Sequence, residues 1–312
     1  VPLPAGLLAE DSRVSLDLSP SLAAMALSGV HYLLNYPWGC AEQTANGMLP
    51  AAALLGAFQR AGVTPPGWEA PAERFAPYVR RLVSFQSPEC GWGWWRDAEF
   101  DPHITALALD ALTRVVRLGH GGPAAEQALS SGARRMVRSL HEVRSEDGEA
   151  FVIAHLTPLL ELPNATIRFG PLAEGIGGMA TSVFEARERL SPAALALAAR
   201  ARIDLGRKEQ AQRLLELLLA RAERDGAGLH WPATAAGYDA WFGDDIETTA
   251  YALSALAAIA PADARAESVV AWLAGRRTGG YWRSTRTTGP TIIGLADYLA
   301  ARPEEAKPDY RL

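Results

Sequence analysis

The sequence predicts an all-α protein whose helices pair into hairpins and close into a ring. Most segments between residues 72 and 301 place apolar residues at helical spacing, and almost none alternates as a strand does. A Gly/Trp turn followed by a helix that opens with threonine occurs three times, at Trp92, Trp231 and Trp282. We expect the indole rings of these tryptophans to pack between hairpins. Because stacked hairpins bury faces that one hairpin leaves open, the pattern predicts an α/α toroid of about six hairpins.

The first part of the chain combines a possible strand with two helices. Apolar and polar residues alternate over 14–18, which predicts a short strand. Ser19-Pro20-Ser21 supplies an N-cap and an early proline for a helix over 21–34. A second helix follows over 43–60, and Pro50 predicts a kink or restart inside it.

The remainder of the chain is expected to be helix and turn. Residues 62–71 are rich in glycine and proline, and the glycine-rich stretch 166–178 is expected to be an irregular loop. The expected helices span residues 72–85, 103–118, 123–142, 149–161, 179–190, 192–205, 207–224, 246–259, 262–274 and 290–301. The chain thus divides into a leading segment (1–20), a toroid domain (21–302) and a tail (303–312).

Composition and charge exclude several kinds of protein. With 49% hydrophobic residues and a net charge of −5, the chain is typical of a globular protein and has no basic stripe for nucleic acid. Charged residues interrupt every apolar run before it reaches the length of a membrane span. The six histidines show no ligand spacing, so neither a metal nor another cofactor is expected. The start, Val1-Pro2-Leu3-Pro4, is typical of a mature or excised piece of a longer chain.

The stretch Tyr-Pro-Trp-Gly-Cys-Ala-Glu-Gln-Thr carries the candidate chemistry. Cys40 precedes Gln43 by three residues, so a thiol and a carboxamide can face each other across one helical turn. If they condense with loss of ammonia, a thioester joins the Cys40 sulfur to the Gln43 side-chain carbonyl. Tyr36 and Trp38 are the candidate shields of this electrophile. A disulfide between Cys40 and Cys90 is the competing interpretation.

This motif resembles the Pro-aromatic-Gly-Cys-x-Glu-Gln signature of thioester-containing proteins, the alpha-2-macroglobulin and complement group. Later landmarks resemble that family's thioester domain in the same order: the Gly/Trp turn at 91–95, His-Trp at 230–231, Glu-Thr-Thr-Ala-Tyr at 247–251 and Gly-Tyr-Trp-Arg-Ser-Thr at 280–285. The resemblance implies an α/α toroid, with a ring like that of terpenoid cyclases and prenyltransferases. It also implies that the domain is cut from a larger chain, in which β-sandwich domains flank it.

The resemblance further implies a function. The alanine- and arginine-rich composition looks more like bacterial members, which are similar to periplasmic or envelope-anchored traps for foreign proteases. There, cleavage of a bait region elsewhere in the chain exposes the thioester, which then acylates a lysine of the attacker. A single-use endopeptidase inhibitor, not an enzyme, is therefore implied. Its partners are target proteases and the flanking domains, without nucleic acid or membrane contact by this domain, and its location is periplasmic or extracellular.

Four further residues have candidate roles with open alternatives. In complement members, a histidine a little over a hundred residues after the cysteine attacks first, and His155 at about that separation is the candidate acyl relay, or else a core histidine. His103 is a second candidate, or it only opens a helix. Glu42 handles protons or orients the thioester, or it is a solvated residue favoured at a helix start. Cys90 is a candidate buried free thiol.

Two other classes of protein remain open. An α/α-toroid enzyme of the terpene cyclase or prenyltransferase type would share the ring, and Gln86 followed by Trp92 resembles the glutamine-tryptophan repeat of cyclases. However, the sequence has no Asp-x-Asp-Asp motif and no Asp/Cys/His zinc set. A thioester-dead interaction scaffold would use the toroid alone, but it leaves the intact Cys40 and Gln43 unexplained.

Overall fold

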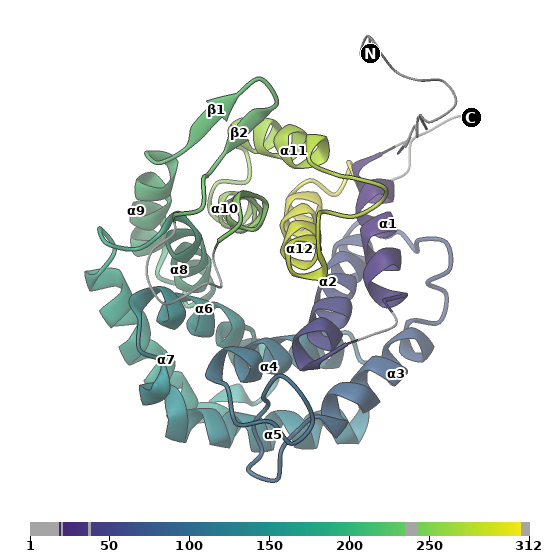
Figure 1. Cartoon of the computed structure of the whole chain (residues 1–312), viewed down its shortest axis with the longest axis vertical. Coiled ribbons are helices and arrows are strands. Elements are labelled where there is room, and N and C mark those ends of the chain that lie inside the picture. The colour runs from purple at the N-terminus through teal and green to yellow at the C-terminus, as the bar shows by residue number, and fades with distance from the viewer. Residues whose placement is uncertain (1–18, 20, 37–38, 235–242, 307–312) are drawn as a thin grey trace, which may run out of the picture.

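The helices form two concentric rings (Figure 1). The computed structural model describes residues 19, 21–36, 39–234 and 243–306. The inner ring contains α2 (Ala41–Arg60), α4 (Pro102–Arg117), α6 (Glu146–Leu156), α8 (Pro192–Asp204), α10 (Asp245–Ile259) and α12 (Thr285–Ala301). The outer ring contains α1 (Leu22–Leu34), α3 (Pro71–Ser84), α5 (Gly122–Ser139), α7 (Ala165–Glu185), α9 (Lys208–Leu219) and α11 (Arg265–Gly275).

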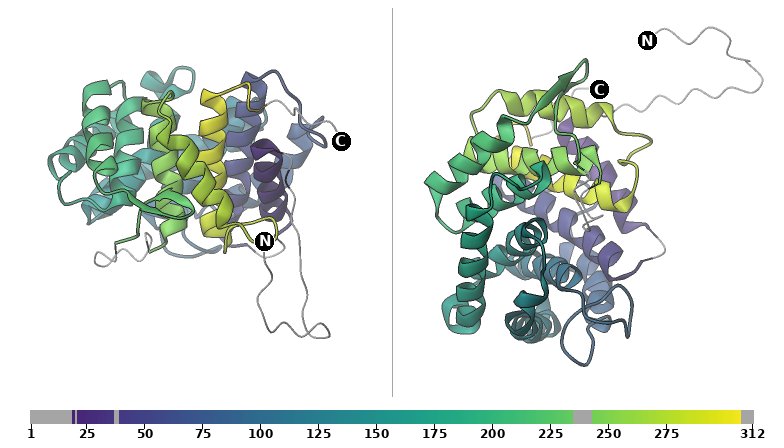
Figure 2. Two further views of the ribbon diagram at one scale, coloured as in Figure 1. Left: turned by 90° about the horizontal axis from the view of Figure 1, so that it is seen from above. Right: turned by 60° about the vertical axis from the view of Figure 1, so that its left-hand side comes forward.

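The inner ring is closed. Each inner helix contacts the next inner helix along the chain, and α12 contacts α2. Figure 2 shows the ring from the side, with the helices crossing its thickness. The predicted all-α toroid is therefore confirmed, whereas the strand expected at 14–18 lies outside the described residues. The proposed division into 1–20, 21–302 and 303–312 stays a prediction.

Burial distinguishes the two rings. All residues from 192 to 199 of the inner helix α8 are buried, because neighbouring helices cover it on every side. The outer helix α9 buries only one stripe, formed by Ala211, Leu214, Leu215 and Leu218. Tertiary packing thus requires an apolar surface around the inner helices and a single apolar face on the outer ones.

Three tryptophans join outer helices to the inner helices that follow them. The backbone N–H of Trp92 donates to the Thr105 hydroxyl (2.9 Å), which donates to the Trp92 carbonyl (3.0 Å). The indole N–H of Trp92 donates to the Leu82 carbonyl on α3 (2.8 Å). The same contacts join Trp231 to Thr249 and Leu218, and Trp282 to Thr288 and Leu273. The expected packing of these three rings between helices is confirmed, and we call the three sites the tryptophan clamps.

The loop predicted at 166–178 is wrong, because this stretch belongs to α7. Phe169, Leu172 and Ile176 are spaced as on one helix face and are buried in the core. Burial of that face outweighs the low helix propensity of the glycines in the stretch. The chain still bends there, since Phe169 has non-helical angles (φ −130, ψ 19) two residues before Pro171.

Several helix ends also differ from the prediction. α9 ends at Leu219, and a hairpin of β1 (Glu223–Asp225) and β2 (Gly228–His230) follows where a longer helix was expected. α12 begins at Thr285 instead of 290, because the Ser284 hydroxyl caps its first turn. α2 is continuous through Pro50. 3₁₀ turns at Leu140–Glu142 and Thr157–Glu161 replace the ends of two predicted helices.

Candidate thioester site

Cys40 and Gln43 meet at the start of the inner helix α2. Cys40 is the N-cap residue with an extended backbone (φ −71, ψ −176), and Gln43 occupies the third helical position. The Gln43 side-chain oxygen accepts the backbone N–H of Cys40 at 3.2 Å. The carboxamide therefore folds back over the first turn toward the residue that carries the thiol, as the spacing predicts.

Three hydrogen bonds hold the chain in this turn. The Arg81 guanidinium on α3 donates to the Gly39 carbonyl (2.7 Å), and the Ala41 N–H donates to the Trp94 carbonyl (2.9 Å). The Thr44 hydroxyl donates to the Cys40 carbonyl (2.8 Å). The Gly/Trp turn at 91–95 thus contacts the motif directly through the backbone, a contact that the sequence reasoning missed.

The Cys40 thiol is buried, with 4% of the residue exposed. Burial raises the pKa of the thiol, and contacts with the Gln43 backbone only partly offset this effect. A buried neutral thiol is protected from solvent and from oxidants. The Cys40–Cys90 disulfide is wrong, because both cysteines are free. Cys90 is half-buried instead of buried, and it occupies a turn at φ 70.

Glu42 is buried beside the thiol, so the solvated alternative for this residue is wrong. One carboxylate oxygen lies 3.9 Å from the Cys40 sulfur, and the other accepts the Asn46 side-chain N–H at 2.5 Å. Burial raises the pKa of Glu42, and the contacts with Asn46 and Arg286 offset this only in part. A carboxyl group that keeps its proton more readily than usual therefore lies next to the sulfur.

Glu42 lines a small internal cavity together with four other ionisable residues. His155, Glu247, Tyr251 and Arg286 reach this cavity from α6, α10 and α12, and we call it the Glu42 cavity. Arg286 lies 3.2 Å from a Glu247 oxygen, and the Tyr251 hydroxyl donates to the other oxygen (3.0 Å). Burial raises the pKa of Glu247 to about 7, although Arg286 opposes the shift.

The raised pKa of Glu247 makes the stability of the fold depend on pH. The folded state retains a proton that the unfolded state loses above the ordinary value of 4.5, so the free energy of unfolding falls as pH rises from about 4.5 to about 7. The expected loss is about 3 kcal/mol. Urea unfolding at pH 5 and pH 8 measures it. Glu247→Gln should remove most of this pH dependence, whereas the exposed control Glu267→Gln should retain it, and equal pH dependence in both variants would contradict the prediction.

His155 lies in the inner ring and faces the Glu42 cavity. It is 7% exposed, and its Nδ1 lies 2.8 Å from an Asp110 oxygen on α4. Its Nε2 has no hydrogen-bond partner among the described residues. His103 instead lies at the start of α4, 3.6 Å from the capping Asp101, and does not line the cavity, which favours its helix-start role.

The two candidate shields are placed differently. Tyr36 is 36% exposed and its ring contacts Tyr32, with centroids 6.2 Å apart. Trp38 lies outside the described residues. Trp94, whose backbone carbonyl accepts the Ala41 N–H, and Trp95 are also exposed, at 41% and 60%. The contact between Trp94 and the motif is set by tertiary structure and has no local signal in the sequence.

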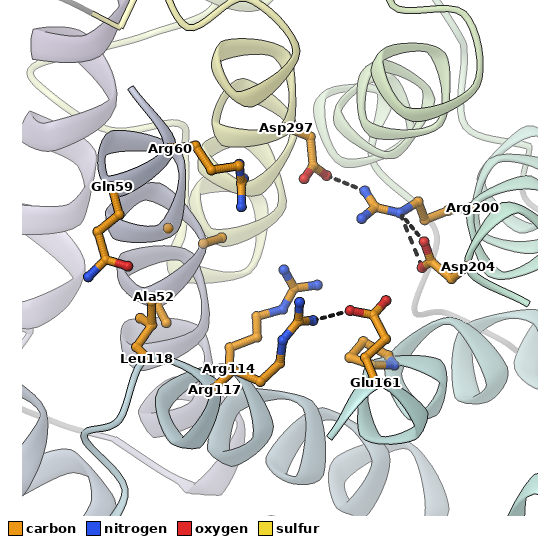
Figure 3. Close-up of a pocket in the computed structure, with 13 residues that line it drawn as sticks. Ala52, Gln59, Arg60, Arg114, Arg117, Leu118, Glu161, Arg200, Asp204 and Asp297 are labelled. Atoms are coloured by element: carbon orange, nitrogen blue, oxygen red, sulfur yellow. Dashed lines mark hydrogen bonds and ion pairs between the residues drawn. The ribbon is translucent and has the colours of Figure 1, made fainter. Parts of the chain in front are cut away.

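A second cavity opens at the other mouth of the ring (Figure 3). It has a volume of ≈ 410 Å³ and is lined by later turns of the inner helices. Arg200 contacts Asp297 (2.6 Å) and Asp204 (3.2 Å), and Arg117 pairs with Glu161 (2.5 Å). The Arg200–Asp297 pair links α8 to α12, and the Arg117–Glu161 pair links α4 to the 3₁₀ turn Thr157–Glu161. This mouth lies opposite the motif, since the Glu42 cavity is lined by early turns of α2, α10 and α12.

Comparisons with known proteins agree with this fold. Residues 180–298 match the family model of the A-macroglobulin TED domain. The chain is 28% identical to alpha-2-macroglobulin of Thermotoga maritima over 112 residues. This aligned stretch covers 36% of this chain and 7% of that protein. The chain therefore spans less than a tenth of the relative. The matched family region lies after Cys40 and Gln43, so the assignment of the motif rests on its own residues.

Solved structures show the same fold. The native alpha-2-macroglobulin of Escherichia coli, spanning domain MG7 to the C-terminus, superposes with a TM-score of 0.62 at 19% identity, over 87% of this chain and 42% of that one. Salmonella alpha-2-macroglobulin reacted with methylamine gives a TM-score of 0.63 at 20% identity, over 94% of this chain and 18% of that one.

The partial match to the A-macroglobulin TED-domain model, together with the closed α/α ring, supports the class of thioester domains. The relatives and the shared fold support, within this class, a thioester domain of the bacterial alpha-2-macroglobulin type. These matches do not favour the alternative of a cyclase or prenyltransferase. Among the described residues, no three His, Cys, Asp or Glu side chains gather as a metal site. None of the described helices has the length and hydropathy needed to cross a bilayer.

Proposed function

We propose that this domain carries a Cys40–Gln43 thioester and serves a bacterial protease inhibitor as a covalent trap that reacts once. The observation that supports it most directly is the Gln43 carboxamide folded back onto Cys40, whose thiol is buried. A turn that holds both groups together raises their effective concentration, and burial excludes water from the bond. The alternative is a scaffold that lacks the thioester and uses the toroid only for interaction, and the experiment below separates the two.

The chemistry needs no cofactor. The Cys40 sulfur attacks the Gln43 carbonyl carbon, and ammonia leaves with the nitrogen. When a lysine amine later attacks the same carbon, an amide forms, the C–S bond breaks, and its electron pair goes to sulfur. The Glu42 carboxyl, whose pKa is raised by burial and which lies 3.9 Å from that sulfur, can supply the proton, and the amine loses one to solvent.

The partners and the location belong to the same proposal. Target proteases are captured through a lysine after a bait region is cut, and β-sandwich domains of a longer chain shield the bond beforehand. The parent protein is placed in the periplasm or on the envelope, in bacterial defence. One related structure is described as reacted with methylamine and another, from Escherichia coli, as trypsin activated, which supports an amine-sensitive bond and a protease trigger.

Intact-mass measurement tests the proposal. The domain, prepared without amine buffers, should be lighter than its sequence by one ammonia, and it should gain one methylamine on treatment. Because the sulfur is released in that reaction, alkylation of Cys40 should appear only afterwards. Full mass and immediate alkylation of Cys40, in both this domain and the longest natural polypeptide that contains it, would favour the thioester-dead scaffold.

His155 is proposed as the acyl relay, because it shares a cavity with Glu42 at the motif. An imidazole nitrogen accepts an acyl group and passes it to hydroxyls, which are poor direct nucleophiles. His155→Ala should therefore slow transfer to glycerol by about tenfold or more, while methylamine reacts at nearly the original rate. The ratio of the two adducts by mass spectrometry measures the effect, and equal slowing with both nucleophiles would remove His155 from the mechanism.

A further inference from the structure

Asp110 is a buried carboxylate shared between two inner helices. It is 1% exposed; one oxygen accepts the Arg114 Nε–H (2.8 Å), and the other faces His155 Nδ1 (2.8 Å). Burial alone would raise the pKa of Asp110, but Arg114 and then His155 more than offset it, so the pKa lies below its ordinary value. Asp110 is therefore ionised and can only accept hydrogen bonds.

This arrangement determines which nitrogen of His155 carries the proton. Because an ionised Asp110 only accepts, the hydrogen of the neutral imidazole lies on Nδ1, and Nε2 keeps its lone pair. Nε2 is buried, lacks a hydrogen-bond partner among the described residues, and belongs to a ring that lines the Glu42 cavity. The basic nitrogen is thus on the side of the ring that Asp110 does not contact.

We propose that Asp110 is a positioning residue, which holds His155 with its Nδ1–H toward the carboxylate and its unprotonated Nε2 in the Glu42 cavity, ready to take the acyl group from Gln43. This inference rests on the proposed thioester function and adds a residue that neither the motif nor the family match includes. Asp110 lies 70 residues after Cys40 on a different inner helix.

The step balances without any further reagent. The Nε2 lone pair attacks the Gln43 carbonyl carbon, the C–S bond breaks, and the sulfur leaves with the electron pair. The acyl-imidazolium that forms keeps its Nδ1–H on Asp110, whose negative charge stabilises the new positive charge. A hydroxyl then attacks the acyl carbon, Nε2 leaves with its electron pair, and the hydroxyl proton ends on the Cys40 sulfur.

Arg114 makes Asp110→Asn a sharp test. Arginine has only donors, so the new amide oxygen must remain on Arg114, and the amide NH₂ must face His155 Nδ1. Nδ1 then accepts, the proton moves to Nε2, and the nucleophilic lone pair is lost. Figure 3 shows Arg114 among the residues that line the mouth cavity. The same wrong-tautomer effect follows removal of the aspartate charge in Ser-His-Asp proteases.

Two measurements test the proposal. In the unaltered domain, the ¹⁵N shifts of His155 should show a protonated Nδ1 and an unprotonated Nε2, and in Asp110→Asn these roles should exchange. The ratio of glycerol to methylamine adducts should fall about tenfold or more in Asp110→Asn, as in His155→Ala. The matched control is Asp204→Asn, which alters another inner-helix aspartate that pairs with an arginine at i,i+4 (3.2 Å). It should leave both readouts unchanged.

The possible failures are distinguishable. A protonated Nε2 in the unaltered domain overturns the role of Asp110, even if Asp110→Asn fails to fold. If Asp110→Asn incorporates methylamine and its ratio of glycerol to methylamine adducts is unchanged, the role of Asp110 is overturned as well, whereas the proposed thioester is supported. Absence of any methylamine incorporation in the unaltered domain refutes the proposed function and the acyl relay together.

Discussion

Cys40→Ala is expected to abolish methylamine incorporation and to leave the domain at its full sequence mass. Without the sulfur, Gln43 keeps its amide nitrogen, and an ordinary carboxamide does not react with amines at neutral pH. Intact-mass measurement before and after methylamine reads the loss directly. The effect is all or none, because the proposed domain contains a single reactive bond.

The chain provides a matched control for this variant. Cys90→Ala removes the other cysteine, which is half-buried in a turn and away from the Glu42 cavity. It should keep the ammonia deficit and the full methylamine gain. If Cys90→Ala also lost incorporation, or Cys40→Ala kept it, the assignment of the thioester to Cys40 would be wrong.

Trp282→Ala is expected to cause the largest loss of stability, about 3–5 kcal/mol in the free energy of unfolding. The indole is fully buried, donates to the Leu273 carbonyl (2.7 Å) and lies where α1 approaches α12 closely. A Cβ on Gly29 would lie 2.9 Å from Ile292 and 3.2 Å from the Trp282 ring, so α1 packs tightly against the indole, and removing the indole leaves a cavity in a close-packed core. Chemical denaturation measures the change.

Two control variants test whether the stability comes from the buried, hydrogen-bonded Trp282 clamp or would be lost with any tryptophan. Trp282→Phe keeps much of the apolar volume but leaves the Leu273 carbonyl without its donor, which should cost about 1–3 kcal/mol. Trp95→Ala removes a ring that is 60% exposed and should change stability by less than about 1 kcal/mol. A loss in Trp95→Ala as large as that in Trp282→Ala would contradict the clamp as the source of stability.

Local patterns in the sequence were sufficient for the ring and the motif. Apolar residues at helical spacing mark the helices, and the Trp/Thr repeat marks where outer and inner helices meet, because each clamp forms within a short stretch of chain. Where local propensity and tertiary burial disagree, the prediction failed. The stretch 166–178 looks like a loop by its glycines, yet burial of Phe169, Leu172 and Ile176 makes it helical.

The surroundings of the motif could not be predicted in the same way. Glu42 looks like a solvated helix-start residue until α10 and α12 close over it, and Glu247 and Arg286 stand more than two hundred residues away along the chain. A charged residue within the apolar stripe of α4 was the one available signal for Asp110. Its partner His155 lies on another helix, 45 residues later.

The sequence by itself determined the candidate thioester pair, because Cys40 and Gln43 are separated by one helical turn and local backbone geometry is enough to bring them together. Only the tertiary structure decided what surrounds that pair. Closure of the ring places Glu42, His155 and the Glu247–Arg286 pair around one cavity, and it brings Asp110 of α4 into contact with His155. Burial then shifts the pKa values of Cys40, Glu42 and Glu247, and burial is a property of the packed ring that no local stretch of sequence contains.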